Sequence, residues 1–160
     1  MNCMYNIFFP DEVISKDDLK FMCVTIERIA RTLKQPNKYI VNTLGYNELV
    51  KKISLANVLH CLNPLQTIDD FVKEYHLEQG GFDITKVDKE FADNIPTVIQ
   101  MGKVYYRLIL STLESNEDYV QGIIRVYNHP ICEILDNYNA SAYYEPSYVI
   151  ERAYYNDGCF

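Results

Sequence analysis

The sequence predicts a mainly α-helical protein built from several short helices, and three observations support this fold class. Apolar residues recur at intervals of three and four along most of the chain, which is the spacing of one helix face. Residues that cap helices precede several of these stripes, and proline or glycine follows them. The composition is globular, with 160 residues of which 48% are hydrophobic and 23% are charged. Such a chain is long enough to bury a sizeable core.

The first half, residues 1–80, is predicted to be a helical unit with an N-terminal arm. Residues 4–9, closed by Pro10, are expected to form a short strand or an arm laid on the body. Ser15 and Asp18 resemble a capping box before an apolar stripe over residues 19–33, which Pro36 ends. The further helices expected here are 37–44 with Gly45 as its C-cap, 47–53, 54–62, and one near 67–79 capped by Thr67 and Asp70.

The second half, residues 81–160, is predicted to be an acidic, tyrosine-rich helical unit packed on the first as one globule. Gly80-Gly81 marks the boundary. A longer helix pair is expected, one helix from Pro96 to about 113 and one from Glu117 and Asp118 to about 127. Isolated glycines in these stripes, Gly102 and Gly122, indicate close helix crossings. A helix of about nine residues should follow from Ile131, residues 147–155 favour a helix over a strand, and one small β element is expected from the termini or residues 82–88.

Charge is distributed unevenly between the two halves. The chain carries 15 basic and 22 acidic side chains, for a net charge of −7. Residues 1–80 hold nine basic and ten acidic groups, and residues 81–160 hold six and twelve. A nonspecific nucleic-acid binder needs a basic surface to displace counterions from phosphate. The balance therefore excludes that class and favours a partner with a basic surface.

The cysteines predict an intracellular protein with reduced thiols. There are five, an odd number, with no Cys-x-x-Cys spacing. Cys23, Cys61 and Cys132 lie on apolar helix stripes and are expected to be buried, whereas Cys159 is expected to be exposed. The N-terminus lacks the basic region of a signal peptide, and no stretch of 18 apolar residues occurs. We therefore expect a soluble, cytoplasmic protein.

No catalytic motif is present, so the sequence favours a protein that is not an enzyme, with no catalytic residues, no metal site and no cofactor. The three histidines have no set of companion ligands at metal-binding spacing. Glu27 on the first helix would need a partner if buried, and Arg31 at i+4 can supply one. Glu27 and His60 are expected to form a structural polar pair, provided that the fold brings them together.

Tyrosines are the strongest positive signal for function, since ten of the 14 lie after Gly81. Tyrosine is enriched at protein interfaces because it covers apolar area at low entropy cost and keeps a polar tip. The C-terminal tyrosines either fold back as a lid over the helices or form an exposed recognition surface. The candidate partner-binding residues are Tyr138, Tyr143, Tyr144, Tyr148, Tyr154 and Tyr155.

The stretch 19–78 contains Phe21-x4-Ile26-Glu27-x2-Ala30, the segment 44–49, Leu59-His60 and Ile68-Asp69-Asp70-Phe71. With these motifs it resembles a small family of uncharacterised bacterial helical domains. Members of that family are often encoded beside proteins that resemble ADP-ribosyltransferases. The resemblance implies an antitoxin-like role, that of a partner which binds and neutralises a toxin encoded by a neighbouring gene. No functional residues are carried over from it.

Three hypotheses of different classes follow. The leading one is a non-enzymatic protein-interaction module, antitoxin-like, for a partner with a basic surface. The first alternative is a helix-turn-helix-type DNA-binding regulator around Gly45, with Lys51 and Lys52 as its adjacent basic pair. The second is a small ligand-binding or enzymatic domain with a cleft between the halves. A homodimer is also compatible with the sequence if internal packing leaves the faces of Tyr105, Tyr119 and Tyr127 uncovered.

Overall fold

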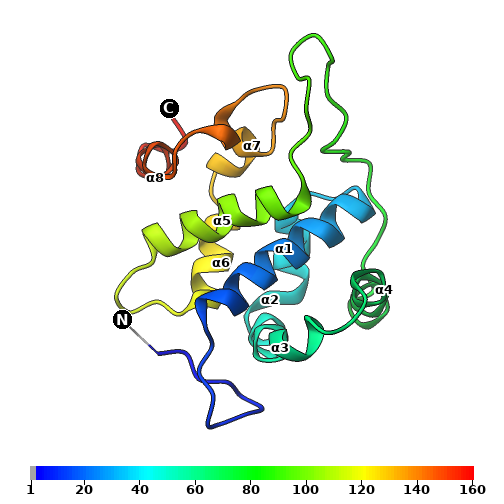
Figure 1. Ribbon diagram of the computed structural model, residues 1–160, viewed down its shortest axis with the longest axis vertical. Helices are drawn as coiled ribbons and strands as arrows, with labels where there is room; N and C mark the ends of the chain where they lie inside the picture. The colour runs from blue at the N-terminus through cyan, green and yellow to red at the C-terminus, as the bar shows by residue number, and fades with distance from the viewer. Residues whose placement is uncertain (1–2) are drawn as a thin grey trace.

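The structure is a computed structural model that describes residues 3–160, and these residues fold into a mainly helical body (Figure 1). Met1 and Asn2, the first residues of the predicted 1–80 unit, lie outside the described residues. The elements in chain order are α1 (Lys16–Leu33), α2 (Asn37–Ser54), α3 (Ala56–Leu59), α4 (Pro64–Tyr75), α5 (Val98–Thr112), α6 (Tyr119–Tyr127), α7 (Ile131–Leu135), the 3₁₀ turn η1 (Ala142–Tyr144) and α8 (Ser147–Tyr155).

The expected small β element does not form as a strand. Within residues 3–160 the β-type pairing is one isolated antiparallel bridge between Tyr5 and Val13 in the arm. Residues 82–88 form turns and irregular backbone instead. Their partial apolar alternation reflects Ile84 reaching into the core from a connector, so a strand there is ruled out.

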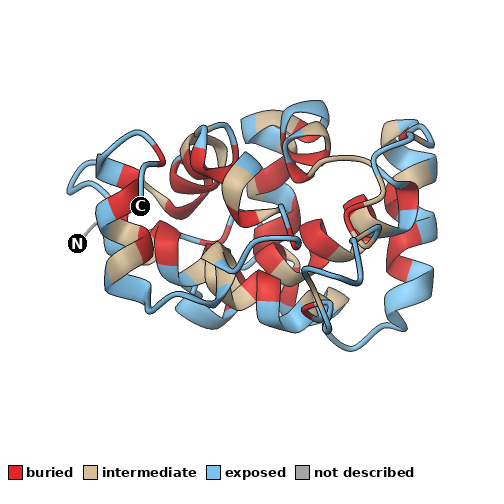
Figure 2. Cartoon of the chain, turned by 90° about the horizontal axis from the view of Figure 1, so that it is seen from above, coloured by how far each residue is buried: buried red, intermediate tan, exposed pale blue. Residues whose placement is uncertain are grey.

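Helix α1 is the centre of the fold, and the sequence defines both of its ends. The Ser15 side chain accepts from the Asp18 backbone N–H while the Asp18 carboxylate accepts from the Ser15 N–H, so the predicted capping box is confirmed. Lys34 ends the helix in the left-handed conformation. Buried residues line α1 on several sides, because it packs against α5, α2, α3 and α4 (Figures 1 and 2).

Of two predicted helix boundaries in the first half, one is confirmed and one is wrong. Gly45 is non-helical, with φ 72° and ψ 177°, and α2 consists of two helices that meet at this kink, so the predicted helix end is confirmed. Its backbone conformation is one that glycine tolerates and other residues avoid. The next helix is capped by Asn63, whose side chain accepts from the Leu65 N–H, and not by Thr67 and Asp70.

The second half follows the predicted order of helices. Thr97 with Gln100 caps α5, and Asp118 with Gln121 caps α6, each by a reciprocal capping box. Residues 147–155 form a helix, as expected. Because α5 packs on α1 and α6 packs on α2, buried apolar side chains from both halves form one cluster.

A close helix crossing joins the two halves at Gly102. A Cβ atom added there would lie 2.5 Å from Cγ2 and 2.9 Å from Cα of Val24 on α1. A methyl group therefore cannot fit unless the backbones of α1 and α5 separate. The predicted role of Gly102 is confirmed, and Gly122 packs similarly against Leu113 and Ile109 side chains.

We predict that Gly102→Ala lowers the free energy of unfolding by about 1–3 kcal/mol, the usual cost of overpacking a core. Denaturant titration followed by circular dichroism measures this. Gly81→Ala is the matched control, because a Cβ at Gly81 meets no atom within 4 Å. Equal stability of the two variants would contradict the close crossing.

Candidate functional site

The six candidate tyrosines separate into an internal and an external set. Tyr138 and Tyr154 are buried, and Tyr143 is half-buried with its ring edge-on to Tyr138 at 5.4 Å between centroids. The expectation that all six bind a partner is therefore wrong for Tyr138 and Tyr154. The three that remain exposed are Tyr144, Tyr148 and Tyr155, at 80%, 70% and 66%.

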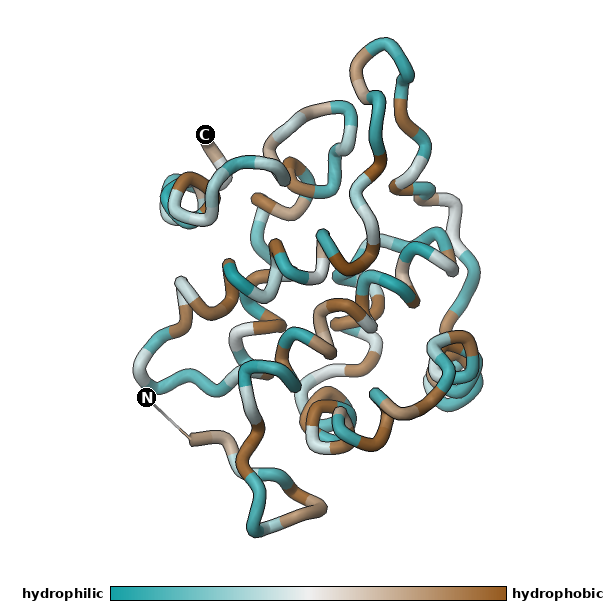
Figure 3. Tube along the Cα trace, viewed as in Figure 1, coloured by the Kyte–Doolittle hydropathy of each residue, from teal (hydrophilic) through white to brown (hydrophobic). Residues whose placement is uncertain are grey.

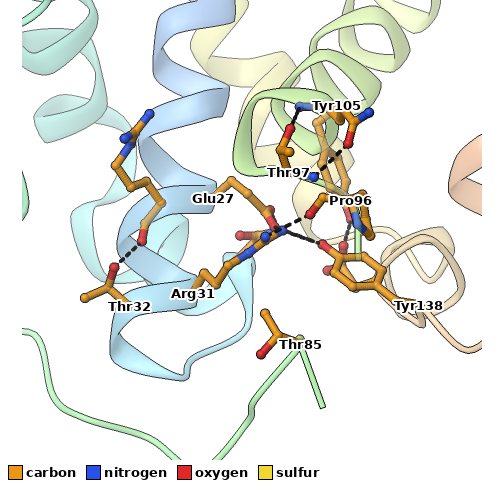
Figure 4. Close-up of polar contacts among 12 residues, drawn as sticks. Glu27, Arg31, Thr32, Thr85, Pro96, Thr97, Tyr105 and Tyr138 are labelled. Carbon is orange, nitrogen blue, oxygen red and sulfur yellow. Dashed lines mark hydrogen bonds and ion pairs between the residues drawn. The ribbon is translucent and has the colours of Figure 1, made fainter. Parts of the chain in front are cut away.

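Tyr138 is internal because it completes the hydrogen bonds of a buried carboxylate. Its hydroxyl donates to Oε1 of Glu27 at 3.0 Å and accepts from Nη2 of Arg31 at 3.0 Å (Figure 4). Arg31 also bonds the same Glu27 oxygen at 2.9 Å, and Asn37 donates to the other oxygen at 2.7 Å. Burial without these partners would cost several kcal/mol. The predicted pairing of Glu27 with Arg31 is thus confirmed.

The expected Glu27–His60 pair does not form. Glu27 is 1% exposed and bonded to three other residues, whereas His60 is exposed at the end of α3. The His60 ring packs edge-on against Phe21, with 5.4 Å between centroids. His60 follows α3 on the side of α1 where Phe21 lies, while Glu27 points toward Tyr138 (Figure 4).

Tyr154 is fixed in the interior by a hydrogen bond from Arg125, a residue that the sequence analysis does not single out. Arg125 donates to both carboxylate oxygens of Glu117, at 2.8 and 2.6 Å, and to the Tyr154 hydroxyl at 2.7 Å. It also bonds the Thr112 hydroxyl and carbonyl. One guanidinium therefore joins α5, α6 and α8, and the hydrogen bonds that it donates to Glu117 raise the pKa of Arg125 above its usual value. No local spacing rule connects residues so far apart in sequence.

Two of the exposed tyrosines lie on one side of α8. Tyr148 and Tyr155 are seven residues apart, which is two helical turns, and exposed Arg152 lies between them. Tyr144 lies before this helix, in η1. A cavity of about 480 Å³ lies between α5 and the segment 143–150, and of the three exposed tyrosines Tyr144 lines it. Lys103 and Arg107 line it from α5, and Glu145 lines it next to Tyr144.

A second cavity, of about 800 Å³, lies between the two halves of the chain. Residues 36–38, 82–86 and 127–139 contribute to its walls. The half-buried carboxyl of Asp136 lines it and accepts a hydrogen bond from the Tyr105 hydroxyl at 2.6 Å. Burial, and then the charge of Glu27, raise the pKa of Asp136 well above its usual value. The raised pKa favours the neutral, protonated form of this carboxyl.

The structure also shows which of the cysteines are buried. Cys23 and Cys132 are buried, and burial raises the pKa of each to about 12, which makes these thiols unreactive. Cys61 is exposed, so its predicted burial is wrong, because it lies in the turn after α3 and not on a helix. The predicted exposure of Cys159 is confirmed, and Cys3 is also exposed.

The two lysines of the DNA-binding alternative are both neutralised by glutamates. Lys51 lies 2.7 Å from Glu48, and Lys52 is buried with its ammonium 2.6 Å from Glu74. Among residues 3–160, no group of three His, Cys, Asp or Glu side chains is arranged to hold a metal ion. Within the same residues, no helix has the length and apolar character needed to cross a membrane.

The Glu27 cluster gives a direct test of its structural role. Glu27→Ala leaves Arg31 partly buried without its carboxylate, so we predict a loss of about 3–5 kcal/mol in the free energy of unfolding. Glu90→Ala, at an exposed site, is the control. Chemical denaturation measures both, and a loss below 1 kcal/mol at Glu27 would contradict the role assigned to the cluster.

The raised pKa of Asp136 predicts a pH dependence of stability. Above its ordinary value of 3.8, the unfolded chain loses this proton while the folded protein retains it, so stability falls as pH rises. Asp136→Asn cannot ionise, so its stability relative to the wild type should increase from about pH 4 upward.

Asp83→Asn is the control of opposite sign. Hydrogen bonds from Thr85 lower the pKa of Asp83, so its charged form favours the folded state and is present above pH 3.8. This variant should lose stability relative to the wild type as pH rises. Thermal melts across pH 4–8 measure both slopes, and parallel slopes would contradict the assignment.

Comparison with known proteins gives no relative from which to transfer a function. No family model matches the chain, no curated protein matches it, and no solved structure matches it.

Proposed function

We propose that this chain is a non-enzymatic protein-interaction module that binds a protein partner through the outward side of α8. The observation that most supports this proposal is the exposure of Tyr144, Tyr148 and Tyr155, of which Tyr144 also lines a cavity. An ordered helix fixes the backbone of two of them before binding, which lowers the entropy cost of forming a complex. Large amphipathic rings on a preformed helix are typical of binding surfaces.

The charge of the second half supports a partner with a basic surface. Residues 81–160 carry a net charge of −6, and exposed Glu145 and Asp157 flank the exposed tyrosines. Lys103 and Arg107 line the cavity, and exposed Arg152 lies between Tyr148 and Tyr155 on α8, so the charge in this region is mixed in sign. We expect the acidic charge of the whole half to speed association, while the tyrosines supply most of the affinity.

A more specific proposal is an antitoxin-like role, which is supported by the resemblance of residues 19–78 to the bacterial helical family. Under this proposal the partner is the protein encoded by the adjacent gene. In this role the chain needs a stable body and an exposed binding face, but no reactive groups.

The cavity between the halves favours a second candidate function, a small ligand-binding domain. Its support is a cavity of about 800 Å³ that both halves line, with the Asp136 carboxyl, whose pKa is raised, in its wall. This candidate places the binding site on the side of Tyr138 and not on the outer side of α8. The two proposals therefore predict sensitivity to different substitutions.

We predict that the triple variant Tyr144→Ser, Tyr148→Ser, Tyr155→Ser binds the product of the adjacent gene at least about thirtyfold more weakly than the wild type. Truncating an interface tyrosine commonly costs about 1–2 kcal/mol. Co-expression and co-purification detect the complex, and titration calorimetry of the purified proteins measures its affinity.

Phe91→Ser is the matched control, because Phe91 is an aromatic side chain that is 72% exposed in the connector before α5. It should leave the affinity unchanged. Two proteins that elute separately, or a triple variant that binds as tightly as the wild type, would contradict the proposal.

A further inference from the structure

The connector segment 82–86 forms one wall of the cavity of about 800 Å³ between the two halves, and hydrogen bonds attach it at both ends. The Phe82 N–H donates to the Lys34 carbonyl at 2.8 Å, which joins the connector to the end of α1. The Asp88 N–H donates to Oδ1 of Asn139 at 2.6 Å, which joins it to the segment after α7. A cavity of this volume can hold a small organic molecule.

Aromatic and polar side chains both line this cavity. Along the connector, hydrophobic residues are interspersed among hydrophilic ones (Figure 3). The connector supplies exposed Phe82, and buried Tyr127 and Tyr138 come from the segment 127–139. The face of an aromatic ring attracts a cation. Arg31 already lies over the Tyr138 ring at 5.6 Å, whereas no cation within residues 3–160 lies over Phe82.

The ionisable side chains of the cavity include one more carboxyl group than cations. Three carboxyl groups and two ammonium groups line it, and they are Asp83, Glu133, Asp136, Lys38 and Lys86. The ring of His129 also lines the cavity, but it is uncharged at neutral pH, because burial lowers its pKa and Nδ1 accepts from the Ile131 N–H at 3.0 Å. The wall therefore lacks one cation.

Asp136 is the carboxyl group that has no cation of its own. Glu133 and both lysines are exposed, so water solvates their charges, and Asp83 accepts from the hydroxyl and the backbone N–H of Thr85. Among residues 3–160 no cation forms an ion pair with Asp136. The charge of Arg31 acts on Asp136, but Arg31 is already paired on α1.

A buried tyrosine holds Asp136 at the cavity wall. The Tyr105 hydroxyl donates to Oδ1 of Asp136 at 2.6 Å. The Tyr105 ring is itself fixed, because it stacks on Tyr127 with 4.6 Å between centroids. The carboxyl is therefore positioned before any ligand binds, which is what a binding site requires.

The burial of these tyrosines also decides the homodimer that the sequence allows. Tyr105, Tyr119 and Tyr127 are all buried within the monomer, so their faces are covered internally and are not available as a subunit interface.

From this arrangement we propose that the cavity binds a small organic molecule with a single ammonium group, for which Asp136 is the counter-ion. The proposal rests on the second candidate function, which places a ligand in this cavity, and it names the chemical class of that ligand. As the ammonium binds, the Asp136 carboxyl releases its proton to water, and the ammonium donates to the resulting carboxylate. Such charge-assisted hydrogen bonds are stronger than neutral ones, and the bound cation offsets the cost of a buried charge.

A metal ion does not fit this wall as well as an ammonium does. Hard metal ions take several oxygen ligands. Within residues 3–160 no group of three His, Cys, Asp or Glu side chains could hold one, so Asp136 has no companion ligands. An ammonium needs only one carboxylate and an apolar or aromatic surface for the rest of the molecule.

Titration of the full chain with three probes, followed by NMR chemical shifts, tests the proposal. The probes share one ring and differ in charge, and they are benzylammonium, benzyl alcohol and benzoate. At neutral pH benzylammonium should bind at least about tenfold more tightly than benzyl alcohol, because only the ammonium forms a charge-assisted bond with Asp136. Benzoate should bind most weakly, since it brings a further carboxylate to a wall that lacks a cation.

Two variants locate the site. Asp136→Asn keeps an acceptor for the Tyr105 hydroxyl but cannot ionise, so it should weaken benzylammonium binding at least about tenfold and leave benzyl alcohol unchanged. Glu133→Gln is the matched control, because it removes an exposed carboxylate from the same cavity. It should change the affinity for benzylammonium less than about threefold, as expected for a solvated charge. Circular dichroism verifies that both variants are folded.

The outcomes separate failure of this proposal from failure of the function on which it rests. Benzyl alcohol that binds as tightly as benzylammonium, or equal losses in Asp136→Asn and Glu133→Gln, would overturn the ammonium at Asp136 and leave the cavity as a ligand site. If none of the three probes binds at about 10 mM, the ligand-binding candidate fails, and this proposal fails with it. Neither result depends on the exposed tyrosines of the leading proposal.

Discussion

The buried carboxylate of Glu27 is the interaction on which the rest of the structure depends. It lies on α1, and it is bonded by Arg31 one turn on, by Asn37 at the start of α2, and by Tyr138 after α7. Arg31 extends the contact to the Pro96 carbonyl, just before α5. One charge thus fixes four separate stretches of chain, because each of its hydrogen bonds must be made to offset the cost of its burial.

This constraint determines which tyrosines remain outside. Tyr138 is drawn inward by Glu27, and Tyr154 is drawn inward by Arg125. With both ends of the C-terminal segment attached in this way, α8 packs its Ile150, Ala153 and Tyr154 side against the body. The opposite side of the helix then carries Tyr148 and Tyr155 toward solvent. The exposure of Tyr148 and Tyr155 therefore follows from the burial of Tyr138 and Tyr154.

Local rules predicted the helices well and the contacts between them poorly. The caps at Ser15 and Asp118, the helix at 147–155 and the close crossing at Gly102 all follow from residues within one turn or from a single missing side chain. The helix end at Gly45 also follows from a local rule, because glycine readily adopts the positive φ of 72° found there. Glu27 was identified as needing a partner, but only Arg31 lies within reach of a local rule. Tyr138 lies 111 positions from Glu27 in the sequence, so only the folded structure identifies it as a partner of Glu27.

We propose that the external tyrosines contact a partner while the internal ones build the fold. Chemical nitration of tyrosine, read by mass spectrometry on the chain alone and in complex with the adjacent gene product, distinguishes the two sets. We expect rapid modification of Tyr144, Tyr148 and Tyr155 in the free chain and protection of all three in the complex, with Tyr138 and Tyr154 unmodified in both. Equal modification of the three external rings in the two samples would contradict it.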